Sequence, residues 1–189
     1  MTRLLPSLLA LATSAILMTA IPQAHADTKD TPASAQVAET KGAQLTRLYA
    51  EYWEEVLKLN PIQATFQGDP RYNDQLPDFG SAEFRRQQRE FTERWLKTIQ
   101  GVGSDGLSGQ DLLSYEIFVR DAKSSLDGER FPGWMMRVNQ MSRIASYAVM
   151  LGAGTSAQPF KTVKDYDNWL ARGNKLPQLF DTDITNMRE

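Results

Sequence analysis

The sequence predicts an all-α domain, and three observations support this prediction. Apolar residues recur at steps of three and four in several segments after residue 42, which is the spacing of amphipathic helices. Glycine, proline and asparagine separate these segments at short intervals. None of the segments shows the convincing alternation of apolar and polar residues that a half-buried strand needs. Several helices joined by short turns are typical of an all-α domain.

The first 26 residues have the layout of a signal peptide. Arg3 is the one charged residue before Asp27, and residues 4–21 are mostly Leu, Ala, Ile and Met. Small residues at both positions that a signal peptidase reads predict cleavage near Ala26 and a periplasmic or secreted protein. The alternative is an uncleaved anchor, since an uncharged stretch of this length is just long enough to span a bilayer.

Composition narrows the classes of partner. Removing 26 of the 189 residues leaves 163, the usual size of one domain. The loss of Arg3 leaves 20 basic and 23 acidic side chains, whereas a nucleic-acid partner requires a strongly basic surface. We therefore expect no nucleic-acid partner, and no membrane contact after cleavage. The chain has no cysteine, so apolar burial must stabilise it without disulfides.

Residues 27–41 are small, polar and aperiodic, which predicts a flexible leader before a helical domain at 42–189. The first helix is expected from about Ala43 to the Asn60-Pro61 pair, which then opens a short helical turn through Gln67. An irregular stretch is expected up to Gly80.

Three further helices follow from their start and stop signals. Ser81 is the expected N-cap of a helix that ends at Gly101, and residues 108–111 are the capped start of one that ends at Gly128. Thr162 and Asp165 have the spacing of a capping box. Residues 144–151 fit a buried helix or a strand, and the pattern does not separate the two.

A last apolar stripe follows the turn at residues 173–174. Its members are Leu176, Leu179, Phe180, Ile184 and Met187. The stripe runs to Glu189 without a glycine or asparagine stop signal. From this feature alone, a chain that ends inside a helix and an ordinary frayed terminus are equally expected.

Residue types argue against common active sites. His25 is the one histidine, and it lies in the segment expected to be removed. Without His or Cys, a zinc site needs an all-oxygen shell, which zinc rarely uses. Serine catalysis lacks its usual imidazole base, and no Ser-x-x-Lys motif offers a lysine instead. Asp181 and Asp183 begin like a calcium loop, but the spacing then fails, and we expect solvated acids.

Other candidate motifs have simpler interpretations. The glycine patterns at 101–106 and 152–157 lack the strand-to-helix context of a dinucleotide site and are expected to be loops. Trp53, Trp95 and Trp169 lie on helical stripes and are expected in the core.

Four segments together resemble a known bacterial family. They are YWEEVLKLNPIQATFQGDPRYNDQLPDFG (52–80), LSGQDLLSYEIFVRDAKSSL (107–126), RVNQMS (137–142) and FKTVKDYDNWLARGNKLPQLFDTDITNMRE (160–189). In this order they resemble the N-terminal part of the domain-of-unknown-function family 885 (DUF885), whose members look like exported zinc metallopeptidases. The resemblance implies a His-Glu-x-x-x-x-His-like zinc helix well downstream of the matched region. No catalytic or metal-binding residue can be carried over to this chain, and zinc is implied only for a full-length relative.

The resemblance also supplies the site and partner hypotheses. Asn139 and Gln140 lie in a stretch that in relatives looks as if it approaches the substrate cleft; the alternative is amides that serve a loop or cap. We expect the N-terminal helical portion of an exported hydrolase, inactive alone, whose partner is the missing C-terminal half of the same fold. The alternative is a self-contained periplasmic helical module that binds a peptide or protein partner.

Overall fold

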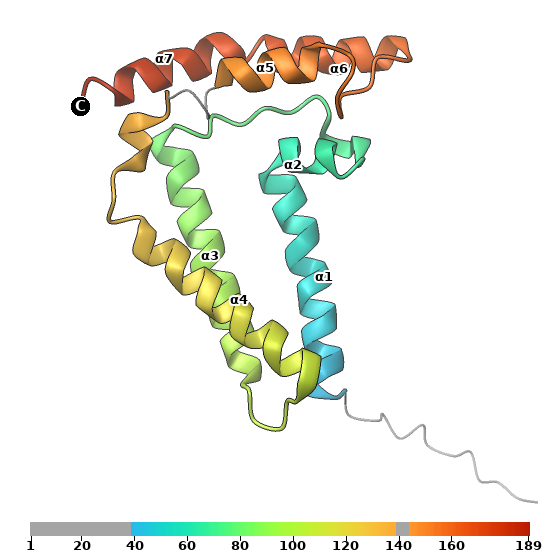
Figure 1. Ribbon diagram of the computed structural model, residues 1–189, viewed down its shortest axis with the longest axis vertical. Helices are drawn as coiled ribbons and strands as arrows, with labels where there is room; N and C mark the ends of the chain where they lie inside the picture. The colour runs from blue at the N-terminus through green and yellow to red at the C-terminus, as the bar shows by residue number, and fades with distance from the viewer. Residues whose placement is uncertain (1–38, 139–143) are drawn as a thin grey trace, which may run out of the picture. The chain divides into compact units, whose positions relative to one another are not determined.

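The computed structural model describes residues 39–138 and 144–189. Every regular element in these two stretches is a helix, which confirms the all-α prediction (Figure 1). The α-helices are α1 (Lys41–Leu59), α2 (Pro61–Phe66), α3 (Ala82–Val102), α4 (Gly109–Gly128), α5 (Ile144–Gly152), α6 (Val163–Gly173) and α7 (Leu176–Asn186). Two 3₁₀ turns are η1 (Pro70–Tyr72) and η2 (Gly133–Met136). The predicted signal peptide and most of the leader lie outside the described residues.

Capping side chains set most helix starts where the sequence predicts them. The Ser81 hydroxyl accepts a hydrogen bond from the Phe84 N–H at 3.1 Å. Thr162 and Asp165 make both bonds of the capping box. Ser108 begins α4 without a side-chain cap bond, so that part of the prediction is wrong. Residues 144–151, which the pattern left open, are helical in α5.

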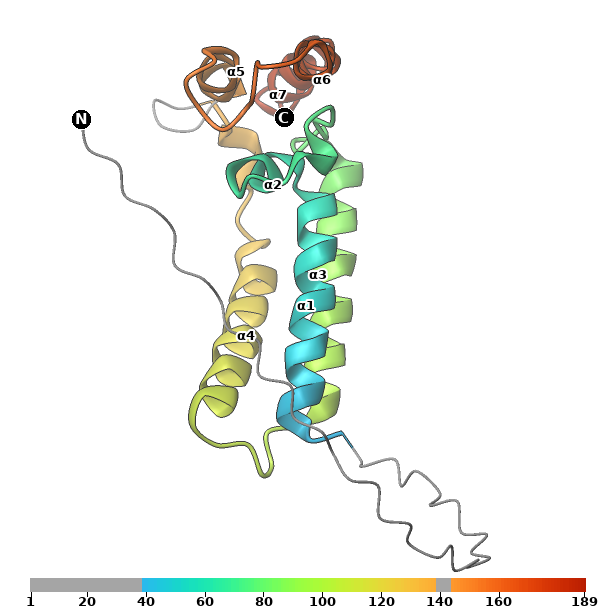
Figure 2. The same cartoon turned by 90° about the vertical axis from the view of Figure 1, so that its right-hand side faces the viewer.

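Helices α1, α3 and α4 pack together around an apolar core (Figures 1 and 2). Its buried members are Leu45, Leu48, Trp95, Ile99 and Val102. The apolar stripes of three helices meet here, and burial of each large side chain contributes about 1.5–3 kcal/mol. All five buried members lie on α1 and α3, which explains why the apolar spacing of these two helices is so clear in the sequence.

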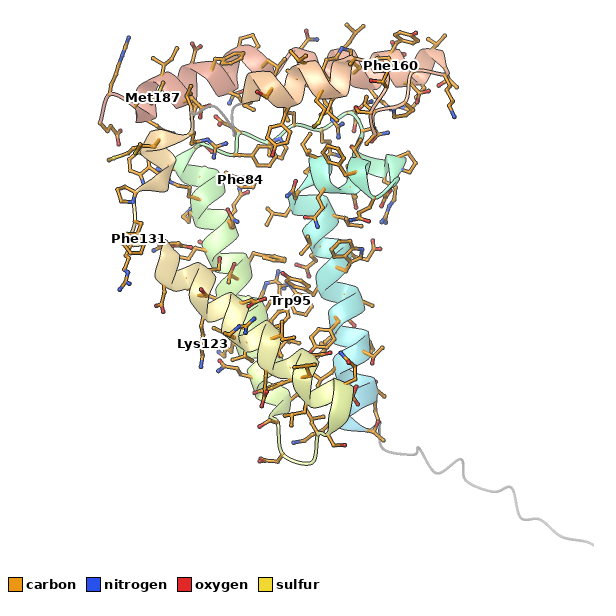
Figure 3. All side chains as sticks on the ribbon, in the orientation of Figure 1. Phe84, Trp95, Lys123, Phe131, Phe160 and Met187 are labelled. Atoms are coloured by element: carbon orange, nitrogen blue, oxygen red, sulfur yellow. The ribbon has the colours of Figure 1, made fainter. Side chains whose placement is uncertain are left out.

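Aromatic rings extend this core. The ring of Tyr52 lies 5.6 Å from that of Trp95, which Figure 3 labels, and 5.0 Å from that of Phe118, both in edge-to-face geometry. The core prediction holds for Trp95, whose exposure is 3%. It is wrong for Trp53, which is 39% exposed, because α1 turns its Leu45 and Leu48 face toward α3 and α4.

The C-terminal helices bury fewer apolar residues. Helix α7 packs against α5 and η2, with Leu151 and Leu179 buried. The inner face of α7 also holds Asp183 and Asn186, while Phe180, Ile184 and Met187 of its apolar stripe are exposed. None of the helices in the described stretches is long and apolar enough to cross a membrane.

Candidate functional site

A buried arginine on α6 organises one side of the candidate site. Arg172 is 1% exposed, and its side chain reaches segments about a hundred residues earlier in the chain. Its Nε donates a hydrogen bond to the Gln75 carbonyl at 3.0 Å. Its Nη2 donates to Thr65 Oγ1 at 2.6 Å and to the Tyr72 carbonyl at 3.0 Å. Arg172 thereby ties α6 to α2 and η1.

The charge of Arg172 has no carboxylate in contact with it among the described residues. Its remaining acceptors, Gln158 Oε1 and the Pro61 carbonyl, are neutral as well. Burial lowers the pKa of Arg172 to about 10, and Asp74 opposes this only through space. The amide nitrogen of Gln158 is also buried and has no hydrogen-bond partner in the described part of the chain. The interior around Arg172 is therefore electropositive.

A second arginine in the candidate site, Arg137, is paired with a carboxylate. Arg137 Nε donates to Asp183 Oδ1 at 2.9 Å, and Nη1 donates to the Phe79 carbonyl at 3.3 Å. Asp183 is 4% exposed, so the expectation of a solvated acid is wrong. The reason is that α7 packs closely on the loop before α3, where Asn186 Nδ2 donates to the Gly80 carbonyl at 3.0 Å.

These two arginines and Asp183 line a cavity of about 580 Å³, called here the Arg172 cavity. The rest of its lining is mostly apolar and comes from α2, the loop after η1, η2 and α5 to α7. It consists of Asn60, Ile62, Gln63, Phe66, Leu76, Phe79, Gly133, Met136, Tyr147, Ala148, Leu151, Trp169 and Leu176. The cavity has the size and lining of a small-molecule site.

A second cavity of about 780 Å³ adjoins the first. Its wall includes the aromatic residues of the α1, α3 and α4 core, among them Tyr52 and Trp95. Asn60, Gln63, Phe79 and Arg137 line both cavities. The two cavities are therefore neighbours with Arg137 in a shared wall, and both have an apolar and aromatic character.

The site residues predicted from sequence are not those that the structure brings together. Asn139 and Gln140 lie outside the described residues. Sequence reasoning missed Arg137 and Arg172, because single arginines in amphipathic segments normally face water. The local sequence carries no signal for Arg172, since the burial of Arg172 and of Asn168 four residues earlier is visible only in the structure.

The described residues do not fit a zinc site. No group of three or more His, Cys, Asp or Glu side chains in residues 39–138 and 144–189 lies close enough together to hold a metal ion. The acids that line the two cavities are already engaged, Asp183 by Arg137 and Asp121 by Arg120. The mostly apolar lining is suited to binding.

The two glycine patterns are loops, as the sequence predicts. Gly103 and Gly106 have positive φ angles of 74° and 81° in the turn between α3 and α4. Gly154 has a φ of 71° in the loop after α5. Neither segment follows a strand in the described structure, so neither has the context of a dinucleotide site.

Comparison with known proteins gives a family. A search of curated proteins and a search of solved structures each found no match. The model of one family, described as bacterial protein of unknown function (DUF885), matches residues 61–189. This match covers the residues that line the Arg172 cavity except Asn60. The chain therefore belongs to the DUF885 family.

Proposed function

We propose that these helices form one wall of the substrate cleft of an exported, metallopeptidase-like hydrolase of the DUF885 family. In this proposal the catalytic zinc is held by residues other than these 189, and this chain alone is inactive. Family membership supports the proposal, together with the signal-peptide layout of residues 1–26. The two neighbouring cavities that Arg137 lines supply the binding surface.

The observation that carries the proposal is a pair of exposed apolar stripes. On α6 the stripe consists of Val163, Tyr166 and Leu170, and on α7 of Phe180, Ile184 and Met187. The spacing in each helix is that of a face which normally packs against another element. Val163 is 78% exposed and Leu170 60%. Apolar faces of this kind mark surfaces that another protein segment covers.

A self-contained binding module for a peptide or protein is the second candidate function. The Arg172 cavity favours it, since a cavity with apolar walls and a few polar groups is sufficient for binding without catalysis. The two candidates differ in what the apolar stripes do. A module that is complete as it stands has no need of an uncovered face on two neighbouring helices.

The experiment compares the purified chain with a variant that carries Leu170→Glu and Ile184→Glu. The matched control carries Gln178→Glu and Thr185→Glu, which add the same charge at exposed positions of α7. The wild type and the control are expected to bind an apolar dye and to self-associate in sedimentation velocity. The stripe variant is expected to be monomeric, with unchanged helical circular dichroism.

A wild-type chain that is monomeric, melts cooperatively and binds no apolar dye would contradict the cleft-wall proposal. That result would favour the self-contained module, because no uncovered face would then remain to be explained. Equal behaviour of the stripe variant and the control would also count against the assignment of the contact face to α6 and α7.

A further inference from the structure

We propose that the Arg172 cavity binds an organic anion with one carboxylate on an aromatic or large apolar body. This inference deepens the proposed cleft function by naming the chemistry of the ligand, and it rests on that function for its biological meaning. Three features of the cavity support it: the lining, the net charge and the state of the two guanidinium groups.

The apolar lining of the cavity favours a ligand with an apolar body. Aromatic and aliphatic side chains from α2, α5 and α6 form most of the wall, including Phe66, Tyr147, Leu151 and Trp169. A volume of about 580 Å³ lies within the usual range for small-ligand sites. Aromatic rings prefer offset or edge-on contact with other rings, so a phenyl-sized group fits this wall better than a sugar or a phosphate.

The charged groups select an anion. Among the described residues, the charged members of the lining are Arg137, Arg172 and Asp183, which leaves one positive charge in excess. Asp183 neutralises Arg137 through its contact with Nε. Arg172 is held by carbonyl, hydroxyl and amide oxygens, which satisfy its N–H groups without cancelling its charge. A buried charge without a partner is costly, so an added anion in this cavity is stabilised.

One nitrogen of the Arg137 guanidinium is left to contact the anion. Arg137 engages Asp183 and the Phe79 carbonyl through Nε and Nη1, and no hydrogen bond from its Nη2 lies within the described stretches. Nη2 can donate a charge-assisted hydrogen bond to one oxygen of a carboxylate, which is stronger than its bond to a neutral amide oxygen. We therefore assign Arg137 the direct contact and Arg172 the electrostatic attraction from the cavity wall.

The experiment uses isothermal titration calorimetry with two acids and their neutral counterparts. N-acetyl-phenylalanine represents the end of a peptide, and 3-phenylpropionate represents a free aromatic acid. Each is compared with its amide. We expect at least one acid to bind, at least tenfold more tightly than its amide. The tighter of the two acids then identifies the source of the carboxylate.

Two variants of one ion pair give opposite expectations. Asp183→Asn removes the anion from the lining and is expected to tighten binding of the acid severalfold. Arg137→Gln is expected to weaken it at least tenfold, with little change for the amide. Since Arg137→Gln leaves Asp183 buried without its partner, the double variant Arg137→Gln/Asp183→Asn serves as the check on folding. It is also expected to bind the acid more weakly than Asp183→Asn does.

Equal affinity for acid and amide, or no binding of either acid at millimolar concentration, would overturn the proposal. So would unchanged acid affinity in the Arg137→Gln and Asp183→Asn variants. These results leave the cleft-wall proposal standing, because its test reads dye binding and association at the exposed stripes. Conversely, a chain that is monomeric but still binds the acid would refute the cleft-wall proposal and support the anion site.

Discussion

At the scale of single residues, Gly80 is a position where two distant parts of the chain lie close together. A Cβ at this position would lie 3.0 Å from Asp183 Oδ1 and 3.1 Å from Thr182 Cγ2. Gly80→Ala is therefore expected to destabilise the fold by about 1–3 kcal/mol, because α7 must move away from the loop. The check is the midpoint of urea unfolding.

Gly101 provides the matched control. It lies in the last turn of α3, and a Cβ there meets no heavy atom within 4 Å. Gly101→Ala is expected to stabilise the protein by up to about 0.5–1 kcal/mol through reduced backbone freedom. Similar losses at both positions would show that Gly80 is not a close-packing site.

A second prediction for single residues concerns the contribution of Arg172 to stability. Arg172→Met removes the donors of five hydrogen bonds, three of them buried, and we expect a loss of about 3–5 kcal/mol in the free energy of unfolding. Arg120→Met, at an exposed side chain of α4, is the control and should change stability by less than about 0.5 kcal/mol. A small effect at Arg172 would mean that its hydrogen bonds do not hold α6 to α2.

At the scale of elements, the sequence predicts the helices far better than their inner faces. Caps and apolar spacing place α1, α3 and α6 within a few residues, because these signals are local. Which face of α7 is buried depends instead on contacts with distant parts of the chain. Its Asp183 is buried where α7 packs on the loop before α3 and pairs with Arg137, 46 residues away, while the apolar Ile184 is exposed. Arg172 escapes sequence reasoning for the same reason, since its acceptors lie in α2 and the loop around η1.

The α1–α3–α4 core makes its own prediction. Ile99 is fully buried among Leu45, Leu48 and Trp95, and Ile99→Ala is expected to cost about 2–5 kcal/mol. Leu113→Ala on α4, at a side chain that is 49% exposed, is the comparison and should cost less than about 1 kcal/mol. Thermal unfolding followed by circular dichroism measures both. Equal losses would place the core elsewhere.

At the scale of the whole molecule, stability is expected to fall in acid. Arg94 lowers the pKa of Glu55 below its ordinary value of 4.5, and Arg71 and Arg86 lower those of Asp69 and Glu83. A carboxyl whose pKa is lower in the folded state stabilises that state above its ordinary pKa, and this contribution is lost as the pH falls through the folded value. The melting temperature should therefore decline steadily below about pH 4.5.

A variant of Glu55 tests whether the ion pairs cause this pH dependence of stability. Glu55→Gln removes one of these carboxyls, so the melting temperature of the variant should decline less steeply with acid than that of the wild type. Glu189→Gln, at an exposed residue of the C-terminal end, is the control and should leave the slope unchanged. A melting temperature that stays flat down to pH 3 would contradict the ion-pair account.

The most direct test of the cleft-wall proposal is the structure of a longer DUF885 protein that includes the downstream segment proposed to bind zinc. We expect this segment to hold a metal, to cover the counterparts of the α6 and α7 stripes, and to place the metal facing the cavities at Arg137. Stripes that stay exposed to solvent, with the zinc remote from the Arg172 cavity, would contradict it.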